Sequence, residues 1–267
     1  MSEPRAPDQR AVNFRGGGFE PAGRRWASWL AFAAIVALWQ IASSTGLLSP
    51  VAMPSPLAVV NALHDLFVSG KLWNHLGQSL YRIGLGWLIG TTAGLAIGLA
   101  MGIFSVARAI GIPVTAALFP IPKIALLPLF ILWFGIGESS KVATIALGVF
   151  FPTVISAYSA VDNVQRNLIR MGQSFGVPAS AIVAKIILPG AMPGILAGFR
   201  ISSSIALILV VAAEMIGAEY GIGAFILAAG NLMQTDQLVA GVVLLSLLGL
   251  AVSVVLTRLE RRLLRWR

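Results

Sequence analysis

The sequence predicts an all-α integral membrane protein with six transmembrane helices. Of its 267 residues, 57% are hydrophobic and only 11% are charged, which lies far outside the range of soluble globular domains. Several uncharged runs also reach the roughly 20 residues that a helix needs to cross the hydrocarbon core of a bilayer. Because a backbone in lipid must satisfy its own hydrogen bonds, we expect these runs to be helices.

The first predicted element is an arginine-containing N-terminal tail, residues 1–25, which we expect to be flexible and cytosolic. A transmembrane anchor follows over residues 26–45. This run has full spanning length and contains Trp29 and Trp39, so it differs from the shorter apolar region of a cleaved signal peptide.

An external segment over residues 46–81 comes next, and we expect it to contain an interfacial or surface helix. Ser55 and Pro56 are typical of an N-cap and a first helical residue. Apolar residues then recur at helical spacing: Leu57, Val60, Leu63, Leu66 and Phe67.

The remaining five spans lie in a core of residues 82–257, and a basic C-terminal tail, residues 258–267, follows it. The spans are predicted at 82–105, 112–134, 141–161, 193–217 and 237–257. In the first of these, glycine recurs every four residues, at Gly90, Gly94, Gly98 and Gly102. Such a smooth face lets a second helix approach closely, and the alternative is that it lines a substrate path.

Prolines interrupt the predicted span at 112–134, namely Pro113, Pro120, Pro122 and Pro128. Each removes a backbone donor and disfavours a straight helix. Irregular helix at membrane depth is tolerated where it lines protein or a cavity, so this span is a better candidate for a solute pathway than the uninterrupted first or last span.

The distribution of basic residues predicts that both termini are cytosolic. Only Lys71, Arg82 and Lys141 fall in the outer segments of this topology. The inner segments hold the rest of the assigned residues, which is a strong positive-inside bias: Arg5, Arg10, Arg15, Arg24, Arg25, Arg108, Arg166, Arg170, Lys185, Arg258, Arg261, Arg262, Arg265 and Arg267.

The inner loop over residues 162–192 is too polar for lipid, yet it is periodic enough to form short helices. We expect a helix that ends near Gly176, a turn at Val177 and Pro178, a second helix through Ile186 and a stop at Pro189. These elements make a compact helix-turn-helix finger that points into the cytosol.

This loop resembles the signature loop of the inner-membrane permeases of ABC importers. That signature has Glu-Ala-Ala, three residues, Gly, nine residues, Ile, one residue and Leu-Pro. The spacing from Gly176 through Ile186 to Leu188 and Pro189 matches it, whereas Arg170, Met171 and Gly172 stand where the family has Glu-Ala-Ala.

Further segments narrow the resemblance to the permeases of the nitrate, sulfonate and taurine importer group. These segments are Met53-Pro54-Ser55-Pro56, residues 120–129, Trp133-Phe134-Gly135-Ile136-Gly137 and Ala213-Glu214-Met215-Ile216-Gly217. The resemblance implies a type I importer fold with a five-helix core, to which the first span is an addition. It also implies a bacterial cytoplasmic membrane protein that moves a small anion-like solute.

The resemblance implies several partners: a second permease copy in a homodimer, two cytosolic ABC ATPase subunits and an extracytoplasmic solute-binding protein. ATP and Mg²⁺ would bind to the ATPase, and this chain would bind no cofactor. The finger would dock in the ATPase through Arg170, Met171, Gly172, Ser174, Phe175, Gly176, Val177, Pro178, Ile186, Leu188 and Pro189.

Three ionisable residues fall inside predicted spans, where their cost makes them candidates for function. Lys123 lies near the middle of its span, with Pro122 and Pro128 beside it, and either has a structural partner such as Glu214 or helix carbonyls, or attracts an anion in transit. Glu214 makes a structural or gate contact, and Arg200 lies close enough to the inner surface to snorkel.

Other functions lack their residues in this sequence. There is no cysteine, His64 and His75 have no carboxylate cluster at ligand spacing, and Gly70-Lys71 lacks the rest of a P-loop, so we expect no metal site, no ATP binding and no catalysis. The basic residues lie beside the apolar runs, so topology explains them and nucleic-acid binding is excluded.

The main alternative is an ion-coupled secondary transporter, which usually shows internal repeats. A membrane scaffold is a third interpretation.

Overall fold

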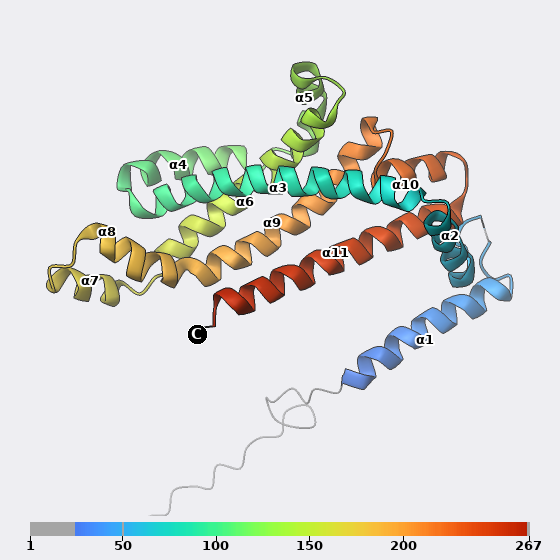
Figure 1. Cartoon of the computed structure of the whole chain (residues 1–267), viewed down its shortest axis with the longest axis horizontal. Helices are drawn as coiled ribbons and strands as arrows, with labels where there is room; N and C mark the ends of the chain where they lie inside the picture. The colour runs from blue at the N-terminus through green and yellow to red at the C-terminus, as the bar shows by residue number, and fades with distance from the viewer. Residues whose placement is uncertain (1–24, 50, 266–267) are drawn as a thin grey trace, which may run out of the picture.

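In the computed structural model, residues 25–49 and 51–265 are described, and they form helices and short connections without any strand (Figure 1). This confirms the all-α prediction. The predicted tail before Arg25 and the last two residues of the chain lie outside the described residues. The helices are α1 (Arg25–Ser44), α2 (Pro56–Val68), α3 (Lys71–Ile103), α4 (Ser105–Leu118), α5 (Leu127–Phe134), α6 (Glu138–Asp162), α7 (Arg166–Ser174), α8 (Ala179–Ile182), α9 (Leu188–Gly217), α10 (Ile222–Asn231) and α11 (Thr235–Leu263).

Four helical stretches are long and apolar enough to cross a membrane: α3, α6, the continuous stretch Ala179–Gly217 that contains α9, and α11. α4 and the segment Lys123–Phe134 together could form a fifth, although they are bent by 85°. The apolar part of α1, Trp29–Ser44, is shorter. The count of six spans therefore stays a prediction that depends on α1 and on the bent pair.

The centre of the molecule is built on the packing of α3 against α6. Glycines four residues apart on α3 face residues four apart on α6: Gly94 lies against Thr153, Gly98 against Ala157 and Gly102 against Val161. A Cβ atom added to Gly98 would lie 2.6 Å from the Cβ atom of Ala157, so glycine is needed for this approach. Because both sets of numbers rise together, α3 and α6 run parallel.

α9 packs on another side of α6 and runs in the opposite direction. Gly194 lies against Ala160, and Gly198 against Ser156, so one number rises as the other falls. Buried Ile145, Val149 and Val210 belong to the apolar core that these helices share. α7 and α8 lie at one end of the bundle, and α2 and α10 lie at the other (Figure 1).

Two helices begin before the spans predicted for them. α3 begins at Lys71, not at residue 82, because its first turns contain Asn74, His75 and Gln78, whose polarity hides a helix from a search for apolar runs. The helix that follows α3 begins at Ser105 rather than at residue 112, with only Phe104 between it and the end of α3 at Ile103.

The predicted start of the external helix is confirmed. The Ser55 hydroxyl accepts a hydrogen bond of 3.1 Å from the backbone N–H of Ala58, and Pro56 is the first residue of α2. The buried face of α2 consists of Val59, Ala62 and Leu66, which pack near Ala240 of α11.

Candidate functional site

The loop predicted to be a finger forms a hairpin of α7 and α8, which we call the finger (residues 166–187). α7 ends in a Schellman motif, in which Val177 N–H donates to the carbonyl of Gly172 and Gly176 N–H donates to that of Gln173, both at 3.0 Å. Gly176 has a φ of +69°, in the left-handed region that glycine enters without steric cost. Pro178 precedes α8, and its carbonyl accepts the N–H groups of Ala181 and Ile182.

Gly172 explains how the finger folds back on itself. It is buried, and a Cβ atom at this position would lie 3.2 Å from Cδ1 of Ile186 and 3.4 Å from Cγ1 of Ile182. The small residue therefore lets α7 pack on the segment after the turn. Arg170 is exposed, and its carbonyl accepts a hydrogen bond of 3.0 Å from the hydroxyl of Ser174.

The outer face of α7 is apolar and exposed. Leu168, Met171 and Phe175 follow one another at helical spacing and are 42%, 53% and 81% exposed. Apolar anchors at such spacing on one helix are the usual means by which a helix binds in a groove of a partner protein.

The prediction that Pro189 stops a helix was wrong. The chain continues through a π-helical turn, Val183–Ile187, into α9, so that Ala179–Gly217 is one continuous stretch. A proline ring clashes with the carbonyl four residues earlier in an α-helix, and that carbonyl, of Lys185, lies within the wider π turn. Leu188 and Pro189 therefore begin α9, and the finger is joined directly to a spanning helix.

Lys123 lies at the break between α4 and α5, in a short 3₁₀ helix, Lys123–Leu126. Its ammonium donates to the carbonyls of Leu118, Phe119 and Ile121 at 3.0, 2.8 and 2.6 Å. An ammonium has three N–H donors, so these carbonyls can use all of them, as the structural interpretation requires. To attract an anion, Lys123 would have to leave them, and that role stays a prediction.

Two of the prolines lie where a missing N–H costs little. Pro122 is the N-cap of the 3₁₀ helix, and Pro128 lies in the first turn of α5. They bring the chain out of α4 and into α5 at the 85° bend, and their place in a solute pathway stays a prediction.

The outer acid Glu214 is part of a buried ionic cluster centred on Arg82 of α3. The Arg82 side chain is 3% exposed, and its Nη1 donates to Oε1 of Glu214 at 2.8 Å and to the carbonyl of Tyr220 at 2.7 Å. Its Nε and Nη2 donate to the two carboxylate oxygens of Glu138, at 2.5 and 2.7 Å. One guanidinium thereby joins α3, the start of α6 and the end of α9.

The Glu214 carboxylate is enclosed by further donors. Oε2 accepts the backbone N–H of Gly223 at 2.8 Å, and the hydroxyl of Ser79 lies 2.8 Å from Oε1. Gly221, with a φ of +142°, lies directly against this carboxylate, where a Cβ atom would collide with it. The carboxylate is thus held by charge and by backbone, which a buried acid requires.

Arg82 and Glu138 were missed from the sequence, since Arg82 was counted only as a basic residue at the outer edge of the span predicted at 82–105. Glu214 was itself a signal, because a buried carboxylate needs a cation and only Lys71, Arg82 and Lys141 lay on that side of the predicted topology. Lys141, the other buried cation, donates to the carbonyl of Gly137 at 3.0 Å instead.

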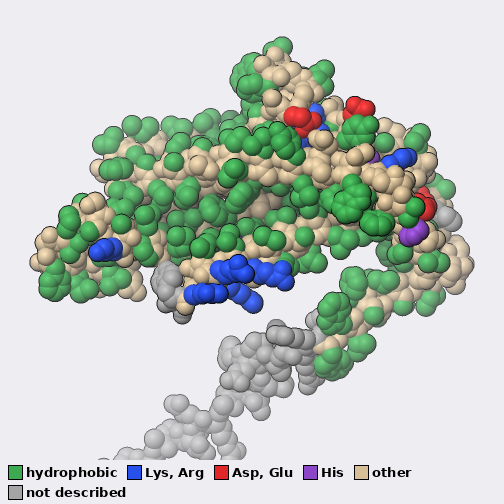
Figure 2. Space-filling model, in the orientation of Figure 1, with side chains coloured by type: hydrophobic (Ala, Val, Ile, Leu, Met, Phe, Trp, Pro, Cys, Tyr) green, Lys and Arg blue, Asp and Glu red, His purple; other side chains and the backbone are tan. Residues whose placement is uncertain are grey.

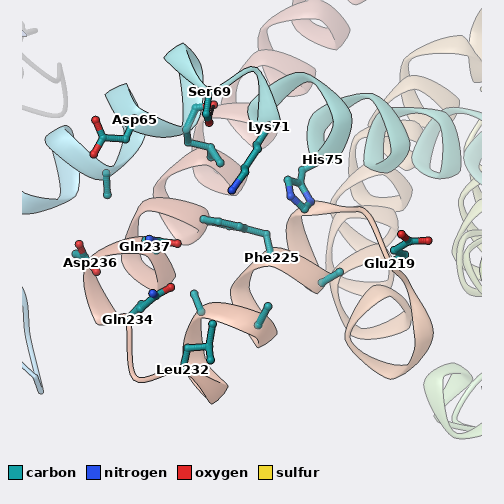
Figure 3. Close-up of a pocket in the computed structure, with 15 residues that line it drawn as sticks. Asp65, Ser69, Lys71, His75, Glu219, Phe225, Leu232, Gln234, Asp236 and Gln237 are labelled. Carbon is teal, nitrogen blue, oxygen red and sulfur yellow. Dashed lines mark hydrogen bonds between the residues drawn. The ribbon is translucent and has the colours of Figure 1, made fainter.

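A recess of about 560 Å³ opens near the cluster, between α2, the start of α3, α10 and the start of α11 (Figure 3). Lys71 points into it toward Phe225, and His75 lies beside both (Figure 3). His75 Nδ1 is 3.2 Å from the backbone nitrogen of Gly221, which itself lies against the Glu214 carboxylate. A residue that lines the recess is therefore connected to the ionic cluster through Gly221.

Comparison with known proteins identifies a family over most of this structure. Residues 90–265 match the model of the "Binding-protein-dependent transport system inner membrane component". The chain is 40% identical to the "Putative aliphatic sulfonates transport permease protein SsuC" of Escherichia coli K12, over 91% of this chain and 92% of that one. It is 36% identical to the "Taurine transport system permease protein TauC" of the same strain, over 88% and 87% of the two chains.

Solved structures agree in fold. A chain of the inward-facing MetNI methionine ABC transporter superposes with a TM-score of 0.58 at 20% sequence identity, covering 73% of this chain and 95% of that one.

Proposed function

Because the chain belongs to the family of binding-protein-dependent transport system inner membrane components, we propose that it is the membrane-spanning subunit of an ATP-driven importer of a small organic sulfonate. The observation that carries the mechanism is the finger, whose exposed apolar face has no partner within the described part of the chain. The names of the sulfonate and taurine relatives support the solute class.

The finger is the element through which ATP hydrolysis moves this chain. Leu168, Met171 and Phe175 dock in a groove of a separate ATPase subunit, which holds ATP and Mg²⁺. Since the finger runs through the π turn into α9 without a break, displacement of the finger displaces a spanning helix. Closure of two ATPase subunits then rocks two permease copies between inward-facing and outward-facing states.

The opposite end of the bundle faces the solute-binding protein. This end carries the recess beside Lys71 and the ionic cluster, which fixes the outer ends of α3, α6 and α9 to one another. The topology is the one that the basic residues predict: the finger and both termini are cytosolic, and the membrane is the bacterial cytoplasmic membrane. Lys123, Pro122, Pro128 and Glu214 stay the candidates for the pathway.

The test reconstitutes the chain in liposomes with its ATPase and its solute-binding protein, and measures ATP hydrolysis with ethanesulfonate, taurine, nitrate and methionine. We expect a sulfonate to stimulate hydrolysis. Phe175→Asp should abolish the stimulation, because it places a charge in the apolar docking face, whereas Gln173→Asp, an exposed polar position on the same helix, should retain it.

Other outcomes would change the proposal in defined ways. Stimulation by nitrate or methionine alone would retain the importer and replace the solute class. Solute uptake that persists without the ATPase would refute the importer and favour an ion-coupled secondary transporter, which the family match does not support.

A further inference from the structure

Four exposed arginines gather at the end of α11. Arg258, Arg261 and Arg262 lie at positions i, i+3 and i+4 of this helix, and Arg265 follows two residues after its end. We call this set the arginine face. Figure 2 shows the patch of basic side chains that gathers over this end of α11.

The arginine face has no acidic partner within residues 25–49 and 51–265. Glu260 is the carboxylate on the same turn of α11, and its Oε2 accepts a hydrogen bond of 2.6 Å from Nη2 of Arg200 on α9. The C-terminal dipole of α11 favours cations, but it acts only over the last turn and does not neutralise four of them.

The same side of α11 is apolar and exposed further toward the helix start. Leu247, Leu250 and Val254, at helical spacing, lead directly to Arg258 and are 54%, 62% and 37% exposed. From Leu247 to Arg258 the helix rises about 16 Å, close to half of a hydrocarbon core of about 30 Å. Lipid tails packed on this stripe would therefore place their headgroups at the arginine face.

A recess of about 490 Å³ adjoins the arginine face between α9 and α11. It is lined by Arg200, Thr257, Glu260, Arg261 and Leu264. Arg261 belongs to both the recess and the arginine face, and an arginine guanidinium binds phosphate oxygens with two parallel hydrogen bonds. The recess offers space in which a phosphate headgroup can reach this fork.

We propose that the arginine face and the apolar stripe above it bind an anionic phospholipid of the leaflet on the finger side. The four positive charges select the anionic headgroup, and the stripe contacts the acyl chains, which a water-soluble partner would leave uncovered. The lipid stands beside the Arg200–Glu260 pair, which joins α11 to α9, and α9 continues from the finger. The proposal rests on the membrane embedding of the proposed function but not on its solute or its ATPase.

The test uses the full-length chain without other subunits, reconstituted in nanodiscs of phosphatidylcholine with a minor fraction of phosphatidylglycerol. After gentle extraction in detergent, the lipids retained by the protein are counted by native mass spectrometry. We expect phosphatidylglycerol to be enriched severalfold over its share in the nanodisc. The enrichment should fall to that share when all four arginines of the face are changed to glutamine.

Two controls separate a lipid site from general effects of charge and folding. Changing the four arginines to lysine should preserve much of the enrichment, because the charge remains. The variant Arg166→Gln/Arg170→Gln/Lys185→Gln removes three charges at the finger and should leave the enrichment unchanged. If the glutamine variant does not fold, the wild-type chain still provides a test, because its enrichment should decline as NaCl is raised.

Three results would overturn the proposal. The first is equal enrichment in the wild type and the glutamine variant. The second is full displacement of the lipid by millimolar inorganic phosphate, which would indicate a simple anion site. The third comes from co-expression of the glutamine variant with the ATPase: loss of ATPase co-purification with unchanged lipid enrichment would assign the arginine face to the ATPase.

Discussion

Arg82 is the residue that makes the burial of Glu214 tolerable. A carboxylate that is 0% exposed in its side chain is costly unless it is paired and hydrogen-bonded, and Arg82 Nη1, Ser79 and the N–H of Gly223 provide those partners. Glu138 occupies the rest of the guanidinium and is 44% exposed in its side chain. The buried Glu214 therefore depends more on Arg82 than Glu138 does, because water also reaches Glu138.

We predict that Arg82→Met lowers the stability of the purified chain by about 3–5 kcal/mol, the usual cost of leaving a buried charge without its partner. Glu138→Gln should cost less, because water can reach that carboxylate. Thermal unfolding in detergent, followed by intrinsic fluorescence, measures both. A control is the double variant Arg82→Met/Glu214→Gln, which should regain part of the loss because no buried charge is left unpaired and water reaches the remaining Glu138 carboxylate. Losses that simply add would contradict the direct coupling of the two residues.

Single residues show where the sequence sufficed and where it did not. Ser55 and Gly176 were predictable because an N-cap and a left-handed turn depend on local chemistry. The pairing of Arg82 with Glu214 spans 132 positions of the chain and depends on how three helices meet, which local patterns do not contain. Lys123 was predicted in part. Helix carbonyls were among its predicted partners, but the geometry of the break that brings three of them to its ammonium was not predictable.

At the scale of elements, the contact between α3 and α6 depends on glycine. We predict that Gly98→Leu prevents this contact, because a Cβ atom alone would lie 2.6 Å from the carbonyl oxygen of Val154. Overpacking of this kind costs about 1–3 kcal/mol, and more where backbone must move. Gly84→Leu is the matched control, since Gly84 lies on the same helix with no atom near its added Cβ atom. Size-exclusion profiles in detergent should show aggregation for the first variant alone, and equal profiles would refute the prediction.

The turn of the finger gives a second prediction at this scale. Gly176→Val should strain the turn by about 1–2 kcal/mol, because a side chain is disfavoured at a φ of +69°. Gly176→Asn should be milder, since asparagine tolerates the left-handed region. Nothing lies within 4 Å of the added Cβ atom, so we expect the global unfolding of both variants to change little. Solute-stimulated ATP hydrolysis should fall more for Gly176→Val than for Gly176→Asn. Equal activity of the two variants would show that the turn conformation is unimportant for coupling.

Helix directions, rather than helix lengths, decide how the whole chain crosses the membrane. Since α3 and α6 run parallel, the chain between Ile103 and Glu138 must return from the end of α3 to the level where α3 begins. α4 and α5 therefore carry the chain back along the bundle in spite of their 85° bend, as we expect for one broken span. The sequence predicted this span from its apolar length and its interruption from the prolines, but it could not give the angle of the bend, which follows from the turn around Lys123.

The same reasoning fixes which parts of the chain share a side. α9 runs antiparallel to α6, and α11 runs antiparallel to α9, since Arg200 contacts Glu260 while Leu207 contacts Gly249. The finger and the arginine face therefore lie at one end of the bundle, and α2 with the recess lies at the other. We predict that the side of the finger is the cytosol.

The chain contains no cysteine, so single cysteines can report this topology without background. Ser174→Cys on the finger and Ser69→Cys after α2 are both exposed positions. With a membrane-impermeant maleimide, we expect Ser174→Cys to be labelled only in inside-out vesicles and Ser69→Cys only in right-side-out vesicles. The opposite pattern would invert the orientation, and labelling of both positions from one side would contradict the helix directions themselves. Adding the ATPase to inside-out vesicles should then slow labelling at Ser174→Cys, because docking covers the finger while leaving the far side of the bundle unchanged.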